Sequence, residues 1–258
     1  MAAFLAATVG TFSQVPSRKA LEEENLGDAA AAEYGVPKTA KESVTRQNFN
    51  LHGAMLPQVG TLVPEPSSLD KASMWSVGCE TLDRGFADFS KYKQFFRPLG
   101  IGYARVQSGW EKTEKAKGEY DFAWLDTIVD GLREQGVKPW LSLSYGNKLY
   151  GSTRSKIESM CSKENMEAWN TYVQAIVKHY EGRVDHWEVW NEPNLKDKDV
   201  RWFSELLMNT VRSVRKAAPK AKIIAFGTAR VDYDYICNVF DYINAKDRKI
   251  VGHLQISV

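Results

Sequence analysis

The sequence has little of what marks several large classes of protein. Its three cysteines in 258 residues, Cys79, Cys161 and Cys237, are too few and odd in number for a disulfide scaffold, so we expect free thiols. It has no run of about 18 apolar residues, which argues against a membrane span. The sequence has 34 Lys and Arg residues and 32 Asp and Glu residues, and the two signs of charge are interspersed along the chain. No basic face for a nucleic acid is therefore predicted.

Several motifs that bind cofactors or carry catalysis are also missing. No GxGxxG or GxxxxGK[ST] turn is present, which argues against a nucleotide cofactor. No HExxH pair or GxSxG elbow is present either, and the four histidines are scattered without metal-ligand spacing. The sequence therefore predicts no cofactor and no metal site.

Apolar and aromatic residues are plentiful. Hydrophobic residues make up 43% of the chain, enough to bury a large core and to exclude a disordered tail. All eight tryptophans lie between Trp75 and Trp202, alongside 11 tyrosines and 11 phenylalanines in the whole chain. Aromatic side chains at this density serve as core or as platforms on which sugars stack.

The first 70 residues differ from the rest. They lack sustained periodicity and contain four prolines between residues 37 and 66. We predict an irregular N-terminal arm over 1–70 and a catalytic domain over 71–258. Met1–Phe12 is mildly apolar, but the first basic residue is Arg18, so the basic start of a secretory signal is missing. This favours a cytoplasmic location and leaves secretion open.

From Trp75 onward, short apolar runs alternate with amphipathic segments of helical length, as in βαβ units with a parallel sheet. The predicted strands are Trp75–Thr81, Tyr103–Gly109, Lys138–Tyr145, Val184–Asn191, Ala221–Thr228 and Val251–Val258. The predicted helices are Asp88–Leu99, Ala123–Gln135, Lys163–Tyr180, Val200–Ala217 and Asp234–Ala245. Strands begin about every 35 residues, the usual size of a βα unit.

Two α/β architectures fit this alternation. A doubly wound sheet would favour a glycine-rich phosphate turn after the first strand, which is absent. A (β/α)8 TIM barrel takes about 250 residues, close to the chain length. Once the arm is set aside, about 185 residues remain for six units of this size. We therefore predict an incomplete TIM barrel with six of its eight βα units.

Active sites of such barrels lie at the C-terminal ends of the strands. The fourth predicted strand ends in WEVWNEPN, which places Asn191 and Glu192 at that face. A carboxylate leaving an apolar, Trp-rich strand is expected to be partly desolvated, which raises its pKa and suits a general acid. A purely structural role for Glu192, capping the following loop, stays open.

Several segments resemble the clan A retaining glycoside hydrolases, and most of all family 39, whose members include β-xylosidases. They are GCETLDR, YARVQSGWEKTE, YDFAWLD, PWLSLSYGN and WEVWNEPN, spread over the region from Trp75 to Val258. The resemblance implies that Glu192 is the acid/base and that Asn191 binds the sugar hydroxyl beside the scissile bond. It also implies that Arg105 supports the nucleophile. A buried ion pair of Arg105 with Glu188 or Glu80 is the alternative.

Further sugar contacts are expected around this pair. Trp110 and Trp190 are the tryptophans placed near the sugar, whereas Trp124, Trp140, Trp169 and Trp187 are assigned to packing. Tyr145 and Asn147 follow the third strand and are predicted contacts. Glu80 ends the first strand and either binds sugar or fixes Arg105. The charged run Glu111–Glu119 is predicted to be a solvated loop.

The resemblance implies a second carboxylate, the nucleophile, at the end of a seventh strand. The sequence ends at Val258, within the sixth, so we expect a truncated enzyme that is inactive alone, with exposed strand edges. The predicted function is retaining hydrolysis of a β-linked oligosaccharide or polysaccharide. A non-catalytic sugar-binding barrel and a polysaccharide lyase are the alternatives. The sequence indicates no oligomeric state and no particular sugar.

Overall fold

The computed structural model describes residues 50–51, 54–55, 65–71, 73–153, 156–196 and 199–256. The chain divides into two compact units, the larger including Glu65–Val258 and the smaller Ala7–Pro64. In the smaller unit, β1 (Asn50–Leu51) and β2 (Ala54–Met55) pair antiparallel. Most of the predicted arm over 1–70, Met1–Phe12 included, lies outside the described residues, and a boundary at residue 70 stays a prediction.

The larger unit is built on a parallel sheet whose six strands all correspond to predicted ones. They are β3 (Ser76–Cys79), β4 (Tyr103–Gln107), β7 (Lys138–Leu143), β8 (His186–Val189), β9 (Lys222–Ala225) and β10 (Leu254–Ile256). Each observed strand is shorter than predicted. After β8 and β9, the residues trimmed from the C-terminal ends lie in loops that line the candidate site.

The order of these strands decides between the two predicted architectures. Within the described part of the chain, the strands of this sheet pair in sequence order, β3-β4-β7-β8-β9-β10, and every pair is parallel. A doubly wound sheet needs a point where the strand order reverses, and this sheet has none. The described strands therefore form six consecutive units of a (β/α)8 barrel, which confirms the predicted fold class.

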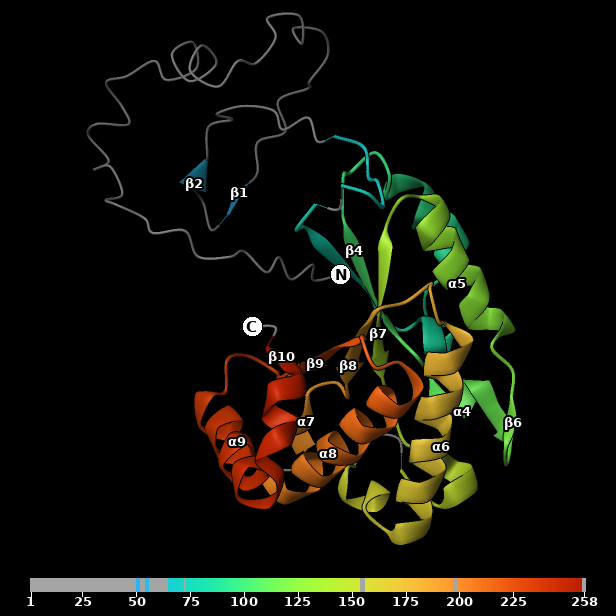
Figure 1. Ribbon diagram of the computed structural model, residues 1–258. Coiled ribbons are helices and arrows are strands. Elements are labelled where there is room, and N and C mark those ends of the chain that lie inside the picture. The colour runs from blue at the N-terminus through green and yellow to red at the C-terminus, as the bar shows by residue number, and fades with distance from the viewer. Residues whose placement is uncertain are drawn as a thin grey trace, which may run out of the picture. The chain divides into compact units, whose positions relative to one another are not determined.

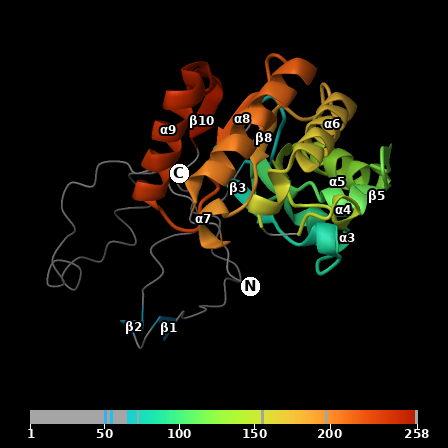
Figure 2. The same cartoon turned by 90° about the horizontal axis from the view of Figure 1, so that it is seen from below.

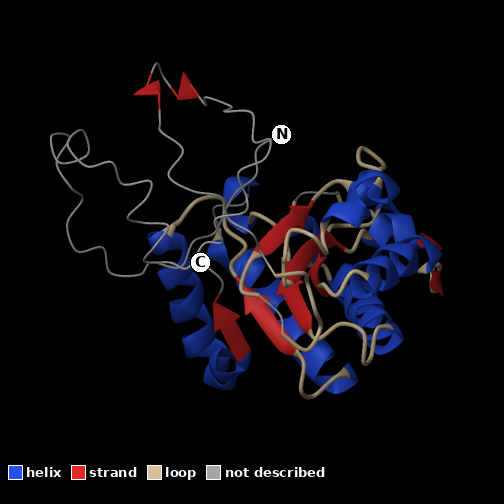
Figure 3. Cartoon of the chain, turned by 90° about the horizontal axis from the view of Figure 1, so that it is seen from above, coloured by secondary structure: helices blue, strands red, loops and turns tan. Residues whose placement is uncertain are grey.

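Helices follow the strands in turn. They are α3 (Phe89–Tyr92), α4 (Trp110–Thr113), α5 (Ala123–Glu134), α6 (Lys163–His179), α7 (Pro193–Lys196), α8 (Val200–Ala217) and α9 (Tyr233–Asp247), with short 3-10 turns between them. In the ribbon of Figure 1, the long helices α5, α6, α8 and α9 lie along one side of the strands. Figure 2 shows them following one another in chain order, and Figure 3 shows the strands lying among the helices.

Helix α8 shows why the outer layer forms. Its buried residues recur at helical spacing, from Phe203 through Leu206, Leu207 and Val211 to Val214, so that one face is apolar. Asp199 caps its start by accepting a hydrogen bond from the backbone N–H of Arg201. This apolar face explains how α8 packs against both α6 and α9.

Turns between helix and strand bring backbone segments close together. Gly136 follows α5 with φ +77°, and a Cβ atom there would lie 2.4 Å from the backbone oxygen of Ser67. Only glycine fits both the left-handed conformation and this close approach. The chain therefore enters β7 directly after α5.

The charged run Glu111–Glu119 differs from the prediction. It contains most of α4 and a small hairpin of β5 (Glu114–Ala116) and β6 (Glu119–Tyr120), and Glu114 is completely buried. The solvated-loop prediction is wrong for Thr113 and Glu114, which are buried because neighbouring donors surround Glu114, as shown below, whereas residues 115–119 are exposed. Among the described helices, none has the length and apolarity to cross a membrane.

Candidate active site

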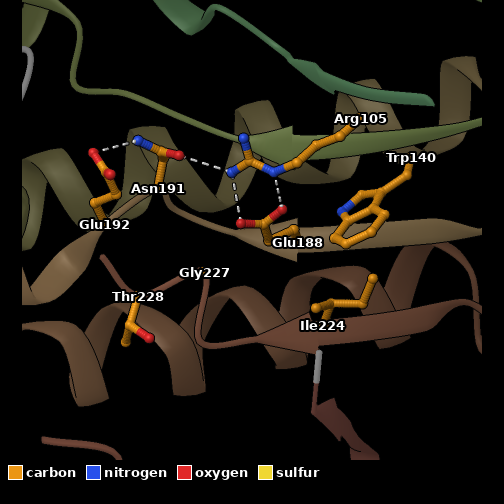
Figure 4. Close-up of a pocket in the computed structure, with 8 residues that line it drawn as sticks. All are labelled: Arg105, Trp140, Glu188, Asn191, Glu192, Ile224, Gly227 and Thr228. Carbon is orange, nitrogen blue, oxygen red and sulfur yellow. Dashed lines mark hydrogen bonds and ion pairs between the residues drawn. The ribbon is translucent and has the colours of Figure 1, made fainter. Parts of the chain in front are cut away.

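A pocket of about 230 Å³ opens where the carboxyl ends of the central strands meet. Its lining comes from β4, β7, β8, β9 and the loops that follow β8 and β9, as drawn in Figure 4. The lining residues are Arg105, Trp140, Glu188, Asn191, Glu192, Ile224, Gly227 and Thr228. Three predicted site residues, Arg105, Asn191 and Glu192, therefore share one cavity.

The end of β8 has an unusual backbone. Trp190 and Glu192 have φ values of +65° and +50°, a left-handed conformation that non-glycine residues rarely adopt. Backbone hydrogen bonds hold both residues there, from Trp190 N to the oxygen of Leu143 (2.9 Å) and from Glu192 N to that of Gly227 (2.7 Å). Such strain costs roughly 1–3 kcal/mol per residue and clusters at functional sites.

Arg105 is the centre of the polar network. Its Nε and Nη2 donate to the two oxygens of Glu188 at 2.6 and 2.7 Å, and its Nη1 donates to Glu80 at 2.5 Å. Burial disfavours the charged guanidinium, but the two carboxylates outweigh this and raise the pKa of Arg105. Both ion pairs proposed as an alternative from the sequence are therefore present.

The same arginine also contacts Asn191, so its two ion pairs and a contact with the candidate site occur together, while its predicted support of the nucleophile stays a proposal. Its Nη2 donates to Asn191 Oδ1 at 2.8 Å, and Asn191 Nδ2 in turn donates to Glu192 Oε2 at 3.4 Å. Figure 4 shows this chain of contacts running from Glu188 through Arg105 and Asn191 to Glu192. Glu80 joins this chain at Arg105, which it binds through Nη1, so it fixes Arg105, one of the two roles predicted for it.

Tyr145 joins the network beside the pocket. Its hydroxyl accepts a hydrogen bond from Gln107 Nε2 at 3.1 Å and also interacts with the side chain of Asn191. Burial is the main cause that raises the pKa of Tyr145, so the hydroxyl keeps its proton at neutral pH. Tyr145 contacts the site through Asn191, and its contact with sugar stays a proposal.

Glu192 itself is exposed. The expectation that the Trp-rich strand would partly bury this carboxylate is wrong, because the left-handed turn directs the residue out of the strand toward the rim. The neighbouring tryptophan side chains point into the core instead. Within this structure the case for Glu192 rests on its position beside Asn191.

Trp110 and Asn147 lie elsewhere, around the buried carboxylate of Glu114. The ring of Trp110 is fully buried and stacks between Tyr150 and Tyr172, so both of its faces are occupied. Its Nε1 donates to Glu114, as does the hydroxyl of Tyr150. Asn147, 1% exposed, donates to the backbone oxygen of Glu114 at 2.9 Å. The prediction that Trp110 and Asn147 line the sugar pocket is therefore corrected.

Trp190 is also corrected. It is 1% exposed and packs edge-to-face against Tyr145 and Trp169, with ring centroids 5.4 and 6.1 Å away. Its ring therefore belongs to the core. What it contributes to the site is its left-handed backbone immediately before Asn191.

Five lining residues were not predicted for the site: Trp140, Glu188, Ile224, Gly227 and Thr228. Trp140 was assigned to packing, yet it pairs in register with Arg105 and lines the same cavity. Gly227 and Thr228 follow β9, so the rule that sites lie at the C-terminal strand ends would have found them. Among the described residues, no group of three or more His, Cys, Asp or Glu side chains is arranged to hold a metal ion.

Comparison with solved structures identifies the class of fold first. A family 39 glycoside hydrolase from Bacteroides cellulosilyticus WH2 superposes with a TM-score of 0.56 and 24% identity, covering 73% of this chain and 38% of that one. At this identity the likeness supports the fold, a (β/α)8 barrel, and nothing finer.

The family follows from the sequence. The model of glycosyl hydrolases family 39 matches residues 87–244, more than half of the chain, and the chain belongs to this family. It is 32% identical over 118 residues to a β-xylosidase of Caldicellulosiruptor saccharolyticus and 25% identical over 119 residues to one of Geobacillus stearothermophilus. These matches cover 38% and 40% of this chain, but only 24% of each relative's length.

Proposed function

We propose that this chain carries the acid/base part of a retaining glycoside hydrolase that acts on β-linked xylose-type sugars. The observation that carries the proposal is the Asn191–Glu192 pair at the end of β8, held by Arg105 in a chain of family 39. The β-xylosidases among the similar proteins support the choice of sugar.

In the first step, the Glu192 carboxyl would donate its proton to the glycosidic oxygen while a second carboxylate attacks the anomeric carbon. The glycosidic bond breaks, and a covalent glycosyl-enzyme forms. In the second step, the Glu192 carboxylate would take a proton from water as that water displaces the second carboxylate. Asn191 Nδ2, which faces Glu192, would hold a sugar hydroxyl beside the breaking bond.

Neither carboxylate already in this network is suited to the attack. Glu188 is 1% exposed and both of its oxygens accept hydrogen bonds from Arg105. Glu80, 41% exposed, uses one oxygen to bind the same arginine. We therefore propose that the nucleophile lies outside the six strands of the parallel sheet, and substitution of Glu80 tests this proposal.

The acid/base role is tested with aryl β-xylosides in the longest chain that the gene encodes. Glu192→Gln is expected to lower kcat by about 10²–10⁴ for poor leaving groups, since they need protonation, and to spare good ones in the first step. Glu205→Gln on α8, outside the site, is the matched control. An equal loss for both kinds of leaving group would argue against general acid catalysis by Glu192.

Assays of the 258-residue chain distinguish a nucleophile outside the chain from Glu80 as the nucleophile, and a hydrolase from a sugar-binding barrel. We expect it to bind xylobiose in calorimetry without turnover, and Asn191→Ala to weaken that binding. Turnover by this chain that Glu80→Gln abolishes would make Glu80 the nucleophile. Sugar binding without turnover in any longer chain from the same gene would favour the sugar-binding barrel.

A further inference from the structure

Glu188 is the most buried charged group of the site, and the two-carboxylate reaction gives it no part. Its side chain is 1% exposed and projects from the middle of the sheet, where it pairs in register with Ser142 and Ile224. Its oxygens take the two parallel hydrogen bonds of Arg105, Nε to Oε2 and Nη2 to Oε1. This bidentate geometry fixes the plane of the guanidinium.

The orientation of Arg105 in turn determines that of Asn191. A guanidinium only donates, so its contact with Asn191 must use the amide oxygen, Oδ1, at 2.8 Å from Nη2. Nη2 is the same nitrogen that donates to Glu188 Oε1. With Oδ1 engaged, the NH2 group of Asn191 faces Glu192 Oε2. Reversing this amide would set two donors against each other.

Gly227, in the loop after β9, contacts the same network. A Cβ atom on Gly227 would lie 2.0 Å from Glu188 Oε1 and 3.7 Å from Arg105 Nη2, so the carboxylate occupies the space that any side chain would need. The carbonyl oxygen of Gly227 also accepts the N–H of Glu192 at 2.7 Å. One glycine therefore contacts both ends of the network.

We propose that Glu188, seated against Gly227, is a positioning residue: it orients Arg105 and thereby aims the NH2 group of Asn191 at Glu192 and the sugar. The effect of this role on catalysis rests on the proposed function. The contacts that link Glu188 to the Asn191 amide do not rest on the proposed function, because the structure shows them without any sugar.

The experiment follows the side-chain amide of Asn191 by NMR in the sugar-free 258-residue chain. Glu188→Gln is expected to shift both Nδ2 proton signals, because the substituted amide no longer offers Arg105 two accepting oxygens. Glu205→Gln, which removes the carboxylate that accepts from Tyr242 on the outer helices, is the matched control and should leave these signals in place. A purely stabilising Glu188 would lower the melting temperature without moving them.

Gly227→Ala gives a second variant without a change of charge. Its methyl group should displace the Glu188 carboxylate and shift the same Asn191 signals, whereas Gly252→Ala, where a Cβ meets no atom within 4 Å, should not. The wild-type chain provides a measurement that needs no variant. Restricted rotation should give Arg105 separate signals for its Nη protons.

The outcomes separate the two proposals. Unmoved Asn191 signals in either folded site variant, or averaged Arg105 Nη signals in the wild type, would overturn the positioning role. If the signals shift as expected while Glu192→Gln leaves hydrolysis by the longest chain that the gene encodes unchanged, the proposed function fails and the positioning role stands.

Discussion

At the scale of single residues, the two carboxylates on Arg105 differ most in their exposure. Glu188 is 1% exposed and bidentate, whereas Glu80 is 41% exposed and makes one contact. Removing one partner of a buried ion pair leaves an uncompensated charge and typically costs about 3–5 kcal/mol. An exposed ion pair contributes about 1 kcal/mol or less because water solvates and screens it.

We therefore expect Glu188→Gln to lower the free energy of unfolding by about 3–5 kcal/mol and Glu80→Gln by about 1 kcal/mol or less. Urea denaturation followed by tryptophan fluorescence measures both. Equal losses for the two variants would show that Arg105 does not depend on the buried partner.

Cys79 allows a prediction about pH. It is 3% exposed, and burial is the main cause that raises the pKa of its thiol to about 12. Because the thiolate is the reactive form, the raised pKa keeps the Cys79 thiol protonated and unreactive at pH 9. Iodoacetamide should therefore modify Cys79 only after unfolding, as read by mass spectrometry, whereas half-buried Cys237 reacts in the native chain. Rapid native labelling of Cys79 below pH 9 would contradict this burial.

At the scale of elements, the cap of α6 is open to a direct test. The side chain of Ser162 accepts a hydrogen bond from Asn165 N at 3.2 Å and so satisfies one of the free N–H groups at the start of the helix. Ser162→Ala is expected to lower the free energy of unfolding by about 1 kcal/mol. Thr171→Ala, on the exposed middle of α6, should not destabilise, because alanine favours a helix interior. Equal effects of the two changes in chemical denaturation would show that the cap contributes nothing.

The helices and strands also show which features local sequence patterns predict and which they do not. Helix α8 begins and ends at the residues predicted, because its apolar stripe and its acidic cap are both local signals. The charged run Glu111–Glu119 gave the opposite result. Its composition indicates a solvated loop, yet Glu114 is buried because Trp110, Tyr150 and the N–H of Gly118 all donate to it. Trp110 and Gly118 are each four residues from Glu114, but Tyr150 is 36 residues away, and local composition does not show that it packs there.

At the scale of the whole molecule, the described sheet ends in two strands with one partner each. β3 pairs only with β4, and β10 only with β9, among the described residues. Unpaired strand edges present free N–H and C=O groups that recruit further strands. We expect the 258-residue chain to self-associate as its concentration rises, as measured by light scattering. A monodisperse monomer at all accessible concentrations would contradict this expectation.

The fold and the position of Asn191 and Glu192 at the pocket were predictable from the sequence by itself. Strand and helix periodicities are local, and a regular βα repeat leads to a sequential parallel sheet, whose C-terminal ends carry Asn191 and Glu192. Arg105 was predictable as well, since it lies on a central strand of the same sheet.

The tertiary structure alone decided which side chains reach the pocket. Trp110 and Trp190 face the core and Trp140 faces the cavity, although all three lie on or just after central strands. The same holds for the exposure of Glu192 and for the space that Gly227 leaves to Glu188. The physical reason is that burial and hydrogen-bond partners depend on strand register and on distant segments, which local sequence patterns do not specify.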